Sequence, residues 1–117
     1  MRKLLAIVPL LLVPLAATAA RAHAFLDHAS PAVGSSVASA PSEVVLTYTQ
    51  NLEASFSTVP VTGPGGANVA TGKPQISGST MSVALKSIGP GTYHVHWHVL
   101  SVDTHKTEGN FTFNVGK

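Results

Sequence analysis

The segment 91–102 constrains the fold of this chain more than any other feature of its sequence. Four apolar side chains alternate there with three histidines: Tyr93, Val95, Trp97 and Val99 against His94, His96 and His98. A two-residue period is that of a β-strand, in which successive side chains point to opposite faces. We therefore expect a strand with one apolar face in the core and one histidine face towards solvent.

Short alternating runs of the same kind recur after residue 22, separated by clusters of Gly, Pro and Ser. The last run places Phe111, Phe113 and Val115 on one face, opposite polar neighbours. Strands are predicted over residues 24–29, 43–49, 55–62, 68–70, 80–86, 91–102 and 108–115. This pattern predicts an all-β fold, an immunoglobulin-like Greek-key β-sandwich or barrel of about seven strands.

The first 22 residues have the layout of a secretory signal peptide. Two basic residues precede an uncharged apolar run at 4–20, and the segment closes with Ala20-Arg21-Ala22, which fits the A-x-A cleavage pattern. A retained membrane anchor is the alternative, but the run is broken by two prolines and is short for a span of about 20 residues. We predict cleavage before His23, with residues 1–22 as signal peptide and residues 23–117 as a periplasmic domain.

Composition narrows the function of the predicted mature domain, whose 95 residues are enough for one small domain. Four lysines against five acidic residues leave a formal charge of −1 with histidine neutral, so we expect no nucleic-acid partner. The chain has no cysteine, so its stability must come from β-sheet packing, helped by a bound metal. All six histidines lie in this domain, and histidine is the commonest metal-ligating side chain.

A histidine at the mature N-terminus would offer two nitrogens to one metal ion, its free α-amine and its ring Nδ1. Only the first residue of a chain can form this chelate, and an α-amine loses its proton more readily than a lysine amine does. The polar loop 101–106 adds a carboxylate and an imidazole. Three nitrogens and one oxygen suit the tetragonal preference of Cu(II), whereas the thiolates and clustered thioethers that favour Cu(I) are missing from the sequence. We predict one Cu(II) per chain, bound by His23, Asp103 and His105.

Six motifs spread over the mature domain are informative together: His23-Ala-Phe-Leu, Ser30-Pro31, Ala40-Pro41, Thr49-Gln50-Asn51-Leu52, Gly91-Thr-Tyr-His-Val-His-Trp and Ser101-Val-Asp-Thr-His-Lys-Thr-Glu-Gly-Asn-Phe-Thr-Phe-Asn-Val. Read together, they resemble the CopC family of bacterial copper-resistance proteins. The resemblance implies a seven-stranded Greek-key β-barrel, with Cu(II) bound by His23, Asp103 and His105. We also expect a monomer, with an inner-membrane copper transporter of the same resistance system as a candidate protein partner.

Two features depart from the family pattern. Where some members have a glutamate near the copper, this chain has Gln50, so an anionic fourth or axial ligand is not expected there. Some members carry a methionine-rich loop that binds Cu(I), but the corresponding segment 63–68 has no methionine, and Met81 is predicted to pack within a strand. We therefore expect a protein that binds Cu(II) only.

The histidines of segment 91–102 allow two interpretations. Neighbouring residues on one strand face are about 7 Å apart at the backbone, which is long for two rings to share a metal without bending. We interpret His94, His96 and His98 as a solvated polar face, and a weak accessory Cu(II) or Zn(II) site is the alternative. His28, beside Asp27, is interpreted as a surface residue.

Because no catalytic serine motif accompanies the candidate ligands, we expect copper storage, buffering or delivery and no enzyme activity. The first alternative is an oxidative polysaccharide monooxygenase, since such enzymes also hold copper in an N-terminal histidine chelate. A coordinating Asp103 would, however, fill the position that an oxygen-activating site keeps open. The second alternative is a metal-free immunoglobulin-like module that displays its histidine face to a partner protein, and Cu(II) titration distinguishes it from a copper-binding protein.

Overall fold

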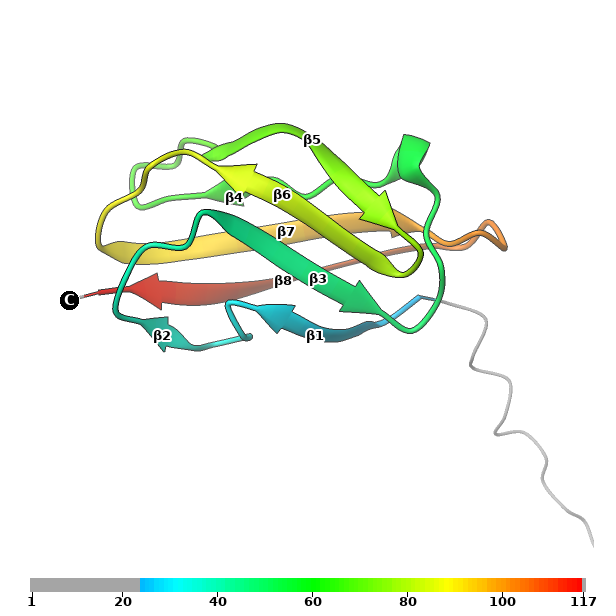
Figure 1. The fold of residues 1–117 in the computed structure, drawn as a ribbon, viewed down its shortest axis with the longest axis horizontal. Helices are drawn as coiled ribbons and strands as arrows, with labels where there is room; N and C mark the ends of the chain where they lie inside the picture. Colours follow the sequence, from blue (N-terminus) through cyan, green and yellow to red (C-terminus); the bar gives the residue numbers. More distant parts are fainter. Residues whose placement is uncertain (1–23, 117) are drawn as a thin grey trace, which may run out of the picture.

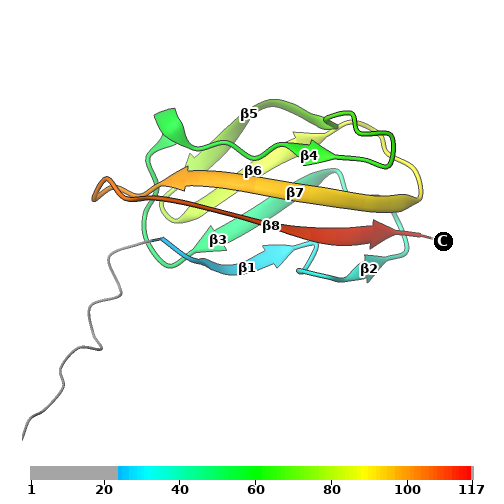
Figure 2. The same cartoon turned by 180° about the vertical axis from the view of Figure 1, so that it is seen from behind.

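The computed structural model describes residues 24–116, which form two β-sheets packed face to face (Figure 1). The front sheet has the strand order β1-β3-β6-β5, and the back sheet, nearer the viewer in Figure 2, has the order β2-β8-β7-β4. The elements are β1 (Leu26–Ser30), β2 (Ser36–Val37), β3 (Glu43–Tyr48), the 3-10 helix η2 (Ala54–Phe56), β4 (Val61–Thr62), β5 (Ala70–Ser77), β6 (Thr80–Leu85), β7 (Gly91–Leu100) and β8 (Lys106–Val115). The predicted all-β sandwich is confirmed.

β7 and β8 form the long hairpin that the alternating sequence predicts. They pair antiparallel along their whole length, and the side chains of His94 and His96 are exposed on the outer face of the back sheet. The buried side chains of this hairpin are Tyr93, Val95, Trp97, Val99, Phe111, Phe113 and Val115. Since each side chain of this size stabilises the fold by about 1.5–3 kcal/mol when it leaves water, the hairpin supplies a large share of the core energy.

The front sheet closes the core from the other side. Leu46 and Met81 are fully buried, so the prediction that Met81 packs within a strand is confirmed. Tyr48, at the end of β3, packs edge-on against Trp97 of β7 with ring centroids 5.1 Å apart. This aromatic contact joins the two sheets near the end of the sandwich that carries the β7–β8 loop.

Three elements differ from the prediction. The segment predicted as a strand at 55–62 is η2 followed by the short β4, the strand predicted at 68–70 is the longer β5, and the two-residue β2 was not predicted. Gly72 and Pro74 lie within β5, where its pairing with β6 shifts register. An edge strand tolerates such residues, whereas a central strand does not. Gly72 and Pro74 interrupt the alternation of apolar and polar residues in β5, and the two-residue β2 is too short to show an alternation.

Three segments meet at one end of the sandwich: the beginning of the described chain, the turn after β3 and the β7–β8 loop (Figure 1). The amide of Thr49 donates to the carbonyl of Phe25 at 2.9 Å. The amide of Val102 donates to the carbonyl of Asn51 at 3.0 Å. The turn after β3 therefore fixes the N-terminal segment and the loop relative to each other.

The predicted signal peptide, residues 1–22, and the predicted ligand His23 lie outside the described residues. Within the described part, no helix is long and apolar enough to cross a membrane.

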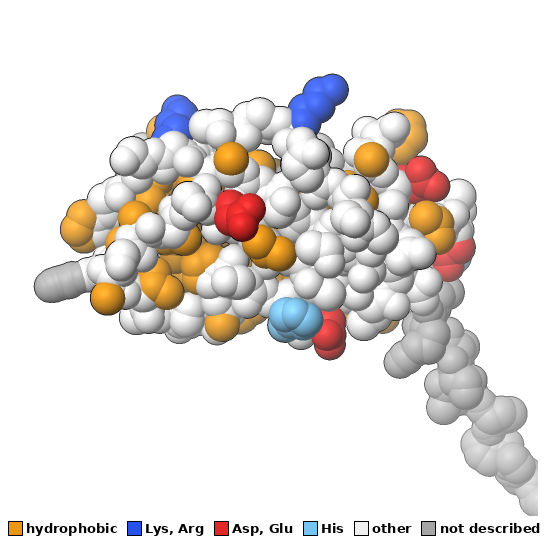
Figure 3. Space-filling model, in the orientation of Figure 1, with side chains coloured by type: hydrophobic (Ala, Val, Ile, Leu, Met, Phe, Trp, Pro, Cys, Tyr) orange, Lys and Arg blue, Asp and Glu red, His pale blue; other side chains and the backbone are white. Residues whose placement is uncertain are grey.

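Figure 3 shows the face of the front sheet, on which basic side chains stand apart from one another along one edge and acidic side chains are scattered. Charge on this face is thus carried by separate side chains.

Candidate metal centre

The β7–β8 loop brings Asp103 and His105 together. The amide of Ser101 donates to the carbonyl of His105 at 3.0 Å, and the amide of Thr104 donates to the carbonyl of Ser101 at 2.8 Å, which closes a tight turn. Thr104 has a φ of 72°, a left-handed conformation that β-branched residues rarely adopt. Nδ1 of His105 lies 3.3 Å from Oδ1 of Asp103. The side chain of His105 is 45% exposed, and that of Asp103 is 42% exposed. Two of the three predicted ligands are therefore adjacent and open to solvent.

Ser101 orients the carboxylate of Asp103. Ser101 is fully buried, and its hydroxyl donates a hydrogen bond to Oδ1 of Asp103. This bond, together with the hydrogen bond and charge of His105, outweighs desolvation and holds the pKa of Asp103 below its ordinary value. Asp103 is thus kept as a carboxylate, the form that binds a cation. The sequence pattern does not single out Ser101, whose one signal is its position as the first residue of the polar loop.

The beginning of the described chain is tied to the same end of the molecule. Ala24 is fully buried, and its carbonyl accepts a hydrogen bond of 2.8 Å from Oγ1 of Thr107, a β8 residue two positions beyond His105. The amide of Phe25 donates to Oγ1 of Thr49 at 2.9 Å. Residue 24 is therefore fixed against β8. His23 directly precedes it in sequence, and its place in the centre stays a prediction.

Gln50 lies in the turn that joins these segments. It follows Thr49, which bonds to Phe25, and precedes Asn51, which bonds to Val102. Its side chain is partly buried at this end of the sandwich. Gln50 thus places a neutral amide in this turn, at the position compared in the sequence analysis with a glutamate of some family members.

On the histidine face of β7, two of the three rings lie close together. The rings of His96 and His98 tilt towards each other with centroids 4.6 Å apart, and both lie near the carboxylate of Glu108 on β8. The exposed side chains of His94 and His96 fit the expected solvated polar face. The rings of His96 and His98 lean together above backbone positions that keep the spacing of one strand face, an arrangement that the alternative interpretation, an accessory metal site, requires. His28 pairs with Asp27 at 3.0 Å, and both are exposed, as predicted for surface residues.

Comparison with protein families assigns the chain. The sequence model of the CopC domain matches residues 26–116, a range that contains the loop with Asp103 and His105. The chain belongs to the CopC family. The predicted family is thereby confirmed, and both sheets of the sandwich fall within the CopC domain.

Relatives of this CopC domain match most of its length. Protein YobA of Escherichia coli strain K12 is 40% identical over 98 residues, which cover 80% of this chain and 79% of that protein. The crystal structure of CopC from Methylosinus trichosporium OB3b has a TM-score of 0.71 at 30% identity, covering 80% of this chain and 94% of the other. PcoC from Escherichia coli, a methionine-rich copper resistance protein, has a TM-score of 0.69 at 34% identity, covering 80% and 99%. Unlike a methionine-rich protein, this CopC chain has only Met1 and Met81.

Proposed function

We propose that this CopC-family protein is an exported protein of copper resistance that holds one Cu(II) for buffering or delivery. The proposed ligands are the amine and ring of His23 at the mature N-terminus, Asp103 and His105. One observation carries the proposal: the hydrogen bond between Thr107 and Ala24 tethers the beginning of the described chain to β8, beside the loop that pairs Asp103 with His105. The copper resistance named for PcoC supports the choice of metal.

The donor set fits the chemistry of Cu(II). Asp103 supplies an anionic oxygen, and its lowered pKa keeps it ionised to a lower pH than an ordinary aspartate. His105 supplies an imidazole nitrogen. The proposed chelate of His23 adds two more nitrogens, which gives the N,N,N,O set that Cu(II) favours in tetragonal geometry. Ser101 and Thr107 support this set through partly buried hydrogen bonds to Asp103 and to the carbonyl of Ala24, and neither is a proposed ligand.

The proposed centre requires export and a free N-terminus at His23. Cleavage before His23 would deliver a mature chain to the periplasm with its amine free. A monomer could then pass its copper to an inner-membrane transporter of the same resistance system. We assign no catalytic step to the site, because a coordinating Asp103 would fill the position that an oxygen-activating copper keeps open.

Removal of either loop ligand tests the proposed function. In the exported mature protein, Asp103→Ala and His105→Ala should each weaken Cu(II) binding by about tenfold or more, since each removes a direct ligand. The affinity is measured by titration against a Cu(II)-chelating competitor. His94→Ala, which removes an exposed histidine on the middle of β7, is the matched control and should bind as wild type does. Wild-type affinity in both loop variants would refute this ligand set.

A further inference from the structure

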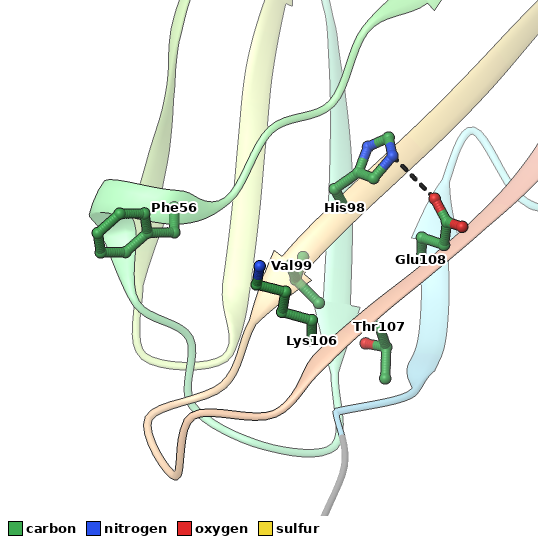
Figure 4. A pocket seen from close by; sticks show the side chains of 6 residues that line it. All are labelled: Phe56, His98, Val99, Lys106, Thr107 and Glu108. Atoms are coloured by element: carbon green, nitrogen blue, oxygen red, sulfur yellow. Dashed lines mark ion pairs between the residues drawn. The ribbon is translucent and has the colours of Figure 1, made fainter.

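The outer face of the back sheet gathers three potential ligands away from the loop. His98 of β7 is the register partner of Glu108 of β8, and His96 is its diagonal neighbour two residues along the strand. Nε2 of His98 lies 2.8 Å from Oε1 of Glu108 (Figure 4), and Nε2 of His96 lies 3.6 Å from the same oxygen. The ligand atoms of all three residues lie within 4.8 Å of one another. Two imidazole nitrogens thus converge on one carboxylate oxygen.

The two separations from Glu108 are close to those that a zinc ion requires. Zinc binds histidine nitrogen and carboxylate oxygen at about 2.0–2.2 Å, so two ligand atoms of a tetrahedral site lie roughly 3.4 Å apart. The distance from His96 to Glu108 already matches this value, whereas the pair formed by His98 and Glu108 must open by about half an ångström. The side chains of His98 and Glu108 are 46% and 64% exposed, so this small rotation meets little resistance.

The backbone beneath these ligands is held firmly. The amide and carbonyl of His98 exchange hydrogen bonds with Thr58 at 2.9 and 2.8 Å, and the amide of His96 donates to the carbonyl of Pro60 at 3.0 Å. On the inner face, Val95, Trp97 and Val99 are buried in the core. The ligand positions are therefore set by the sheet, and only the side chains need to adjust, which lowers the entropic cost of binding.

Solvent has free access to this cluster. An open groove of about 470 Å³ lies beside it, lined by Phe56, His98, Val99, Lys106, Thr107 and Glu108 (Figure 4). The groove leaves room for a water molecule as a fourth ligand. Lys106 opposes a bound cation through its own charge, whereas the carboxylate of Glu108 favours one. Exposed ion pairs contribute little to stability, so the convergence of both rings on Glu108 is not required by the fold.

We propose that His96, His98 and Glu108 form a second divalent-metal site that takes Zn(II). Three protein ligands and an open fourth position are the arrangement of zinc sites that exchange a ligand. The three ligands come from two paired strands, and none belongs to the proposed copper centre. This site is independent of the signal-peptide cleavage that the copper proposal requires.

Titration with Zn(II) alone tests the second site, using exported protein in which Asp103→Ala and His105→Ala have disabled the loop. We expect this double variant to bind one Zn(II), and the further change His98→Ala or Glu108→Gln to weaken that binding by about tenfold or more. His94→Ala in the same background is the matched control, because it removes a histidine from the same strand face outside the cluster. Thermal melting without metal verifies that each variant folds.

Two outcomes would overturn this inference. One is the loss of zinc binding in the loop variant itself, which would place the ion at the proposed copper centre. The other is an equal loss in His94→Ala and His98→Ala, which would indicate diffuse binding along the histidine face. Neither outcome bears on Cu(II) binding by the loop, so the failure of one proposal is distinguishable from the failure of the other.

Discussion

At the scale of single residues, the exposed ligands of the candidate centre depend on buried neighbours. Asp103 and His105 are open to solvent, whereas the hydroxyl that orients Asp103 belongs to the fully buried Ser101. Packing fixes a buried hydroxyl, so it constrains a surface carboxylate more tightly than another surface side chain would. The carbonyl of Ala24 is likewise fixed by the hydroxyl of Thr107, which is partly buried. At the candidate centre, positioning is thus done by Ser101 and Thr107, which are not among the proposed ligands.

The hydroxyl of Tyr48 offers a test of core energetics. It is buried, has no hydrogen-bond partner among residues 24–116, and burial raises its pKa far above the ordinary value. An unsatisfied buried donor is destabilising, so Tyr48→Phe should raise the free energy of unfolding of the metal-free protein by about 1 kcal/mol. Urea denaturation measures this change.

Tyr93→Phe is the matched control for that substitution. The hydroxyl of Tyr93 donates to the carbonyl of Gly89 at 2.8 Å, so its removal should lower the free energy of unfolding by about 1 kcal/mol. Both tyrosines are buried, and they differ in whether the hydroxyl has a hydrogen-bond partner. Equal destabilisation by both substitutions would contradict the view that the Tyr48 hydroxyl is unsatisfied.

At the scale of elements, the β7–β8 hairpin depends on one close approach. Trp97 pairs in register with Gly109, and a Cβ added at Gly109 would lie 2.5 Å from Cζ2 of the Trp97 ring. Gly109→Ala should therefore displace the ring and lower the free energy of unfolding by about 1–3 kcal/mol. Fluorescence of Trp97, the one tryptophan in the chain, follows the transition directly.

Gly65→Ala serves as the control for Gly109→Ala. A Cβ at Gly65 meets nothing within 4 Å, so this change should alter stability by no more than about 0.5 kcal/mol. If the two alanine variants unfolded at the same urea concentration, the contact between Trp97 and Gly109 would not constrain the hairpin.

The strands that the sequence predicts well are those with uninterrupted alternation. β7 and β8 carry long apolar faces, and the structure places both as expected. The alternation of β5 is interrupted by Gly72 and Pro74, residues that an edge strand tolerates. The proximity of Glu108 to two histidines depends on the register between β7 and β8. Alternation within one strand carries no information on that register, so the cluster was not predicted.

At the scale of the whole molecule, the candidate centre depends on segments far apart in the chain. Asp103 and His105 could be identified from their spacing and from the family resemblance, and the loop places them side by side. The bond from Thr107 to Ala24 joins residues 83 positions apart, and no local pattern encodes it. The sequence therefore identifies candidate ligands, while the fold determines how close Ala24 lies to the segment that carries two of them.

The most direct measurement of the central claim compares Cu(II) affinity in two exported proteins whose N-termini are verified by mass spectrometry. One begins at His23, and the other carries one additional alanine before it. The added residue converts the amine of His23 into a peptide nitrogen, so Cu(II) affinity should fall by about tenfold or more while the metal-free melting temperature stays unchanged. At a free Cu(II) concentration of a hundred times Kd, copper should stabilise the first protein by about 2.7 kcal/mol. Equal Cu(II) affinity in the two proteins would contradict the account.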